Sequence, residues 1–129
     1  MTSTRKTFGS ALLAGLLLLG ATPDTRAGEE PITVIARYWV TPGREAEAEP
    51  RFRKALEFMQ EVEPGSSFKM YRSQKDPTLF VYIEVYPSQA ALEKHRQITN
   101  PARAKELGPT PAGLLARAPE IEELRAAEN

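Results

Sequence analysis

The chain of 129 residues contains no cysteine and one histidine, and these two scarcities narrow its chemistry. Without cysteine there is no disulfide, no thiol nucleophile and no thiolate ligand for a metal. One histidine beside scattered carboxylates does not give the ligand spacing of a zinc site, so we expect no bound metal. Histidine ordinarily titrates near neutral pH, so His95 is the first candidate for acid–base chemistry in this chain.

An excess of charge of one sign is missing as well. The chain carries 17 basic and 17 acidic residues, which gives a formal net charge of zero. A nucleic-acid-binding domain would show a basic excess gathered on one face. A glycine-rich phosphate loop is also missing, because residues 41–43 have only the features of a turn. We therefore expect neither a nucleic acid nor a membrane surface as a partner.

Long apolar runs are scarce, and the one that exists lies near the N-terminus. Residues 11–21 read ALLAGLLLLGA; they follow a short basic start and precede small residues that end at Ala27. This layout is typical of a secretory signal peptide over residues 1–27. The run is shorter than the about 20 apolar residues of a transmembrane helix, although an uncleaved anchor is the alternative. We expect a secreted or periplasmic protein whose mature domain spans residues 28–129.

The rest of the sequence shows the periodicities of strands and helices. Alternating β-branched and aromatic residues predict strands, and apolar residues three and four positions apart predict helices. The expected strands cover 31–40, 67–73, 78–86 and 119–124, and the expected helices cover 44–63, 89–97 and 100–107. This order, β-α-β-β-α-β, predicts an α+β fold of the split βαβ, ferredoxin-like type, with helices on one face of an antiparallel sheet.

Local signals refine the helices. Pro50 either kinks the first helix or marks the point where the main helix begins. Ser88 is the expected N-cap of the second helix, and Gly108 the end of the third. The buried stripe of the first helix is expected to comprise Phe52, Ala55, Leu56, Met59 and Val62.

Both faces of the first and third strands are largely apolar or aromatic. In the third strand one face carries Leu79, Val81, Ile83 and Val85, and the other carries Phe80, Tyr82, Glu84 and Tyr86. Helices can cover one face only, so a monomer would leave the other in water. We expect a homodimer in which the sheets of two subunits pack against each other.

Two long segments, ITVIARYWVTPGRE and EPGSSFKMYRSQKDPTLFVYIEVYPSQAALEKH, together with Pro-Glu-Ile near the end, carry a family resemblance. Its most specific part is the strand that ends at Tyr86, followed by Ser88–Leu92 and His95. From Ile32 to Leu124 the chain resembles the antibiotic biosynthesis monooxygenase family of the dimeric α/β-barrel superfamily. The resemblance implies that fold. Family members include cofactor-independent monooxygenases of quinol- or anthrone-like phenols, heme-degrading enzymes and quinone-modifying enzymes.

Departures from the family pattern narrow the expected activity. The family often has tryptophan where this chain has Tyr86. Heme-degrading members use an asparagine, a tryptophan and a histidine at places that here hold Ala36, His95 and Lys105. All three required residue types are missing, so we do not expect heme degradation. The resemblance to the oxygenases implies that no cofactor is used.

The candidate catalytic residues are His95 and Glu84. His95 shares a helical face with Ile98 and is expected to point toward the sheet, where a neutral imidazole could take a proton from a phenol. The structural alternative is a histidine bonded to a backbone carbonyl or to Glu84. Glu84 lies on an aromatic strand face and therefore needs a partner, which His95 or Arg37 could supply.

Three further residues are candidates for substrate binding. Tyr86 could stack on an aromatic ligand, and Arg37 could hold an anionic substrate group or an oxygen intermediate. Trp39, at the end of the first strand, is the third candidate. The structural alternatives are packing for Tyr86, core or dimer packing for Trp39, and a salt bridge at the subunit interface for Arg37.

Two functions follow. The first is the cofactor-independent oxygenation of a phenolic or quinol-type molecule, in which the site deprotonates the substrate and the anion itself reduces oxygen. The second is a non-catalytic dimeric module that binds a small hydrophobic or aromatic ligand in the periplasm, which the export signal favours. A catalytic His95 should meet an open cavity, whereas a packing histidine should be sealed.

Overall fold

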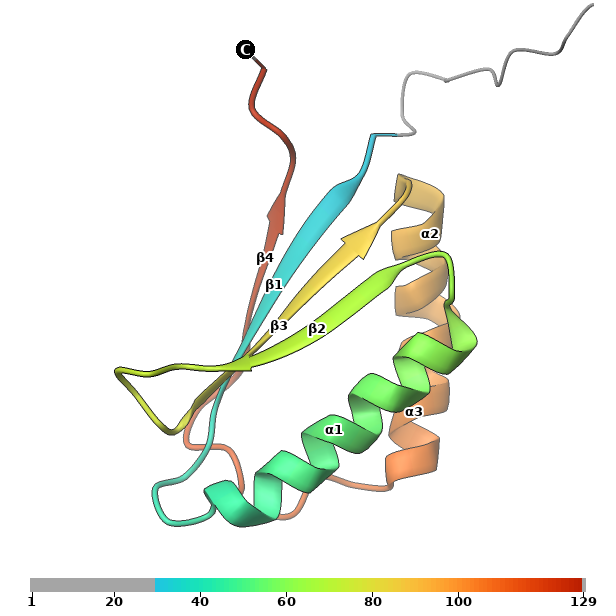
Figure 1. Cartoon of the computed structure of the whole chain (residues 1–129). Helices are drawn as coiled ribbons and strands as arrows, with labels where there is room; N and C mark the ends of the chain where they lie inside the picture. Colours follow the sequence, from blue (N-terminus) through green and yellow to red (C-terminus); the bar gives the residue numbers. More distant parts are fainter. Residues whose placement is uncertain (1–29, 129) are drawn as a thin grey trace, which may run out of the picture.

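The computed structural model describes residues 30–128, so the predicted signal segment at residues 1–27 lies outside the described part of the chain. The elements follow the predicted order (Figure 1). They are β1 (Ile32–Trp39), α1 (Glu45–Val62), β2 (Ser67–Arg72), β3 (Leu79–Tyr86), α2 (Gln89–Lys94), the π-helical turn η1 (His95–Thr99), α3 (Asn100–Leu107) and β4 (Glu120–Leu124). The predicted α+β, ferredoxin-like fold is confirmed.

The four strands form one antiparallel sheet in the order β2-β3-β1-β4. The two long apolar strands, β1 and β3, are therefore central, and their register pairs Ile32 with Tyr86 and Ala36 with Tyr82. Figure 1 shows α1, α2 and α3 on the same side of the sheet. The opposite side of the sheet carries no helix of residues 30–128.

The core lies between the sheet and these helices. Strand side chains alternate between faces, so the even-numbered residues of β1 and β3 point toward the helices. The core comprises Ile32, Val34, Ala36, Phe80, Tyr82 and Tyr86 from these two strands, Phe68 from β2, Ala48, Phe52 and Met59 from α1, Leu92 from α2, and Val40 and Leu114 from loops. Val62, predicted as part of the buried stripe of α1, is 41% exposed, and that prediction is wrong. Glu63, four residues after Met59, takes the buried position instead.

Pro50 lies inside α1, which runs unbroken from Glu45. The alternative of a helix that begins at Pro50 is therefore wrong. The reason is that the first turn is already closed before the proline: the backbone amides of Glu47 and Ala48 both donate to the carbonyl of Arg44. Because Pro50 lies beyond the first turn, its lack of an N–H donor removes one i→i−4 hydrogen bond from the helix.

The second helical region is one continuous run rather than two separate helices. Ser88 caps it as predicted, because its Oγ accepts a hydrogen bond of 3.1 Å from the amide of Ala91. The helix then widens into the π-helical turn η1, in which the Asn100 amide donates to the His95 carbonyl in an i→i+5 hydrogen bond. This shift keeps His95 buried but leaves Ile98 60% exposed, so the expectation that both share a buried face is wrong. Single π-turns inside α-helices are frequent at functional sites.

Candidate functional site

The site centres on a buried pair formed by His95 and Glu63. Nδ1 of His95 lies 2.5 Å from Oε2 of Glu63, and the two residues are 4% and 7% exposed. Glu63 is the C-cap residue that follows α1, and its backbone amide donates to the Met59 carbonyl. The expected partners of a structural His95 were a backbone carbonyl or Glu84, so the partner was predicted wrongly. The one sequence signal near Glu63 is the helix stop at Pro64-Gly65, which places Glu63 at the end of a helix but does not show that it is buried.

Aromatic rings hold the imidazole in place. The ring centroid of His95 lies 5.1 Å from that of Tyr86 and 5.7 Å from that of Phe68. Tyr86 is fully buried. Tyr86 packs against His95 and lines neither of the two cavities described below, so of the two predicted roles, stacking on a ligand and packing, its place in the structure favours packing.

The Glu63 contact fixes how His95 can act. When the carboxylate is ionised it accepts the Nδ1–H bond, and this tautomer leaves Nε2 as a lone-pair acceptor. Nε2 has no hydrogen-bond partner among residues 30–128. In that same part of the chain the one fully enclosed side-chain oxygen or nitrogen without a partner is Oδ1 of Asn100. His95 also lines a cavity.

Glu84 lies on the sheet face that packs against His95, and no hydrogen bond or ion pair joins the two side chains among the described residues. Its side chain is buried, and its Oε2 accepts a hydrogen bond of 2.6 Å from the hydroxyl of Tyr86. The predicted pairing of Glu84 with Arg37 is wrong, because Arg37 lies on the opposite face and pairs with Glu122 at 3.0 Å. The odd and even residues of a strand point to opposite faces, which separates these two charges.

Trp39 also belongs to the open face of the sheet. Its ring is covered by the guanidinium of Arg117, whose central carbon lies 3.3 Å from the ring centroid. The predicted site residues therefore fall into two groups. His95, Glu84 and Tyr86 come together on the helix-covered face, while Arg37 and Trp39 lie on the other.

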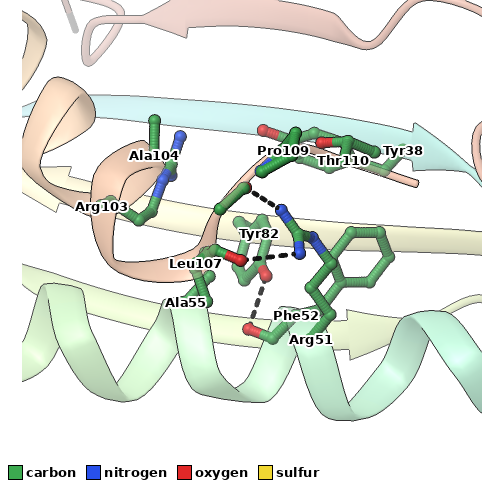
Figure 2. Close-up of a pocket in the computed structure, with 11 residues that line it drawn as sticks. Tyr38, Arg51, Phe52, Ala55, Tyr82, Arg103, Ala104, Leu107, Pro109 and Thr110 are labelled. Atoms are coloured by element: carbon green, nitrogen blue, oxygen red, sulfur yellow. Dashed lines mark hydrogen bonds between the residues drawn. The ribbon is translucent and has the colours of Figure 1, made fainter. Parts of the chain in front are cut away.

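Two cavities open between the sheet and the helices. The first, here called the histidine cavity, has a volume of about 220 Å³; it is lined by Val34, Ala36, Tyr38, Glu84, His95, Arg96, Asn100, Arg103 and Ile121. The second, here called the aromatic cavity, has a volume of about 250 Å³; it is lined by Tyr38, Arg51, Phe52, Ala55, Tyr82, Arg103, Ala104, Leu107, Gly108, Pro109 and Thr110 (Figure 2). Tyr38 and Arg103 line both, so the two cavities are neighbours.

The walls of the aromatic cavity are fixed by hydrogen bonds. The hydroxyl of Tyr82 donates to the backbone carbonyl of Phe52 at 2.7 Å, and Arg51 donates to the carbonyls of Leu107 and Gly108 at 3.1 and 2.6 Å (Figure 2). The ring of Tyr38 packs against those of Phe52 and Tyr82 at centroid distances of 5.4 and 5.6 Å. Such a surface of ring faces and edges suits a flat aromatic ligand.

The tyrosines of the site are hydrogen-bond donors rather than bases. Burial raises the pKa of Tyr38, Tyr82 and Tyr86 above the ordinary value near 10. The carboxylate of Glu84 raises these pKa values further, whereas the guanidinium of Arg103 works in the opposite direction. The groups that can accept a proton in the histidine cavity are therefore His95 and Glu84.

Sequence reasoning did not assign four residues to this site: Asn100, Arg103, Tyr38 and Glu63.

Within residues 30–128 no group of three metal-ligating side chains comes together. No helix in the described part of the chain is long and apolar enough to cross a membrane.

Residues 31–106 match the family model for antibiotic biosynthesis monooxygenases. The chain belongs to this family. A candidate antibiotic biosynthesis monooxygenase from Caulobacter crescentus is 30% identical, with a TM-score of 0.63 over 78% of this chain and 92% of that one. The family prediction made from the sequence is thereby confirmed.

Other solved structures share the fold. PA3566 from Pseudomonas aeruginosa is 25% identical with a TM-score of 0.63, and covers 77% of this chain and 96% of its own. SnoaB, a cofactor-independent oxygenase from Streptomyces nogalater solved as a mutant, is 22% identical with a TM-score of 0.59; the match covers 78% and 96% of the two chains. A comparison with curated protein sequences finds no significant match.

Proposed function

We propose that this member of the antibiotic biosynthesis monooxygenase family is a cofactor-independent monooxygenase of a phenolic or quinol-type molecule. One observation carries the proposal: His95 is held on Nδ1 by Glu63 while it lines a cavity beside Glu84 and Asn100. A histidine oriented by a carboxylate and facing a cavity is the usual arrangement of a general base. A histidine that served packing alone would need no cavity.

The proposed reaction begins with proton transfer from the substrate hydroxyl, or the acidic carbon beside it, to Nε2 of His95. Glu63 stabilises the imidazolium that results, as a buried carboxylate beside histidine does. The electron-rich substrate anion then reduces dioxygen. One oxygen atom joins the substrate carbon, two hydrogens leave the substrate, and the second oxygen atom departs with them as water. All four electrons come from the substrate, so the balance requires no further reductant.

The lining of the cavity contributes to this chemistry. The substrate anion would lie among Val34, Ala36 and Tyr38. A bound substrate would displace water from these side chains, and the loss of water strengthens electrostatic interactions. Tyr38, which stays protonated, would donate a hydrogen bond to the oxygen that carries the developing charge.

Oxygen uptake tests the proposal. Anthrone and 1,4-naphthohydroquinone are suitable probes, with catalase and superoxide dismutase present to suppress spontaneous oxidation. We expect saturable consumption above the rate without protein, at one oxygen molecule per product molecule. Uptake equal to that of a heat-denatured sample would contradict the proposal.

A second candidate is a non-catalytic module that binds a small hydrophobic ligand. One observation favours it: the lining of the aromatic cavity contains neither histidine nor a carboxylate. Saturable binding of an aromatic molecule without any oxygen uptake would support this candidate over the first.

We also propose that the functional unit is an exported homodimer. Ile35, Val81 and Ile83 lie half-buried on the open face of the sheet, and the exposed Tyr71 continues this face at the edge. A second sheet packed there would bury these side chains. Export rests on the pattern of residues 1–27, and N-terminal sequencing of protein recovered from the periplasm, beginning near residue 28, would support it.

A further inference from the structure

The arginines of residues 30–128 divide sharply by what their guanidinium groups contact. Eight of them contact an oxygen atom: Arg37, Arg44, Arg53, Arg72, Arg96 and Arg117 reach carboxylates, Arg51 reaches backbone carbonyls and Arg125 reaches the Gln89 side chain. Arg103 contacts only Sδ of Met59, at 3.4 Å. A thioether is a weak acceptor, so most of the five N–H donors of Arg103 have no acceptor within the described chain.

Arg103 is also the charged residue that lies between the two cavities. It lines the histidine cavity and the aromatic cavity alike, and it is partly buried. A guanidinium in such a place binds a planar anion through two parallel hydrogen bonds. Among residues 30–128, no carboxylate lies within 4.0 Å of the Arg103 guanidinium, so no neighbouring group neutralises its positive charge.

The two cavities differ in charge. The lining of the aromatic cavity holds two arginines, Arg51 and Arg103, and no acidic residue. The lining of the histidine cavity also holds two arginines, Arg96 and Arg103, but there the carboxylate of Glu84 offsets part of their positive charge. An anionic group therefore fits the aromatic cavity, and a hydroxyl group fits the histidine cavity.

From these contacts we infer that the ligand is an aromatic hydroxy acid. Its carboxylate is bound by Arg103 from the aromatic cavity, and its hydroxyl donates to His95 Nε2. The inference rests on the proposed function, because it names the class of phenol that the same site accepts. The ring between the two groups packs on Tyr38, which lines both cavities.

Two compounds that differ in one group test this inference. They are 6-hydroxy-2-naphthoate and 2-naphthol, whose binding to the full domain is measured by titration calorimetry at low salt. We expect the hydroxy acid to bind at least about tenfold more tightly. Arg103→Gln should abolish this preference, and Arg103→Lys should restore part of it, since lysine keeps the charge but not the fork of donors.

Lys105→Gln is the matched control. Lys105 is exposed on the same helix and lines neither cavity, so this variant removes one positive charge without touching the site. It should keep the preference for the hydroxy acid. Arg103 has no ion pair to lose among residues 30–128, so Arg103→Gln should melt within a few degrees of the parent protein.

Equal affinity for the two compounds, or a preference that survives in Arg103→Gln, would overturn the inference. Failure of both compounds to bind would overturn it as well. Oxygen uptake distinguishes the two proposals: turnover of neutral quinols without any preference for an acid rejects the inference alone. A preference that depends on Arg103 without oxygen uptake from any phenol rejects the monooxygenase and keeps the acid-binding site.

Discussion

His95 and Glu63 lie 32 residues apart in the sequence, yet a contact of 2.5 Å joins Nδ1 of one to Oε2 of the other inside the protein. The contact ties the π-helical turn η1 to the end of α1. The contact therefore has two effects: it stabilises the packing of the helices, and it orients the imidazole toward a cavity.

The stability of the fold should depend on this pair. Glu63→Gln and His95→Gln should each lower the free energy of unfolding by about 1–3 kcal/mol, because each leaves a buried polar group without its partner. A double-mutant cycle should give a coupling of about 0.5–3 kcal/mol. Urea unfolding of the four proteins measures it. Glu61→Gln, an exposed change on the same helix, is the control. Additive effects of the two changes would show that the contact contributes nothing of its own.

Stability should also fall in alkaline solution. The pKa values of Tyr38, Tyr82 and Tyr86 are raised in the folded protein, whereas the unfolded chain ionises its tyrosines near pH 10. Above that pH the unfolded chain therefore holds fewer protons than the folded one, and unfolding is favoured as the pH rises. Each buried tyrosine should lower the free energy of unfolding by about 1.4 kcal/mol per pH unit, with no effect well below pH 10.

Denaturant unfolding between pH 8 and pH 11 measures this slope. Tyr82→Phe should make it shallower by the share of one tyrosine, although it also removes the bond to the Phe52 carbonyl and lowers stability at every pH. A slope that does not respond to Tyr82→Phe would mean that this residue ionises equally in both states.

The open sheet face should hold a dimer together. Ile35 and Ile83 are register partners at the centre of this face, and a charge placed there would have to be buried against the second sheet. Ile83→Lys should convert a dimer into a monomer in sedimentation experiments, and it should remove the concentration dependence of melting. Ile98→Lys, an exposed change on η1, is the control. A parent protein that sediments as a monomer of normal stability would reject the dimer.

The fold could be predicted from the sequence because its signals are local. Alternation in β1 and β3, the Ser88 cap and the stop at Pro64-Gly65 each act within a few residues, and all agree with one topology. The errors arose where a distant contact decides the outcome. The π-turn at His95–Thr99 has no sequence signature, and it moved Ile98 to the surface.

The candidate site was predictable only in part. His95 and Glu84 could be named as candidates because a lone histidine and a carboxylate among aromatic residues are unusual. Glu63 and Arg103 were missed, because nothing near them in the sequence shows that tertiary packing buries one and leaves the other without an acceptor. The position of Arg37 relative to His95 could not be predicted, because the sequence does not show whether the odd- or the even-numbered residues of β1 face the helices.

Transfer of labelled oxygen tests the monooxygenase proposal most directly. The mature protein, treated with a chelator and free of added cofactor, is given anthrone under ¹⁸O₂, and the product is analysed by mass spectrometry. We predict that each product molecule gains one labelled atom, that the second labelled atom appears in water, and that His95→Gln slows turnover by about 10²–10⁴-fold while the protein stays folded. A product without label, or labelled turnover that is unchanged in His95→Gln per folded molecule, would contradict the proposed mechanism.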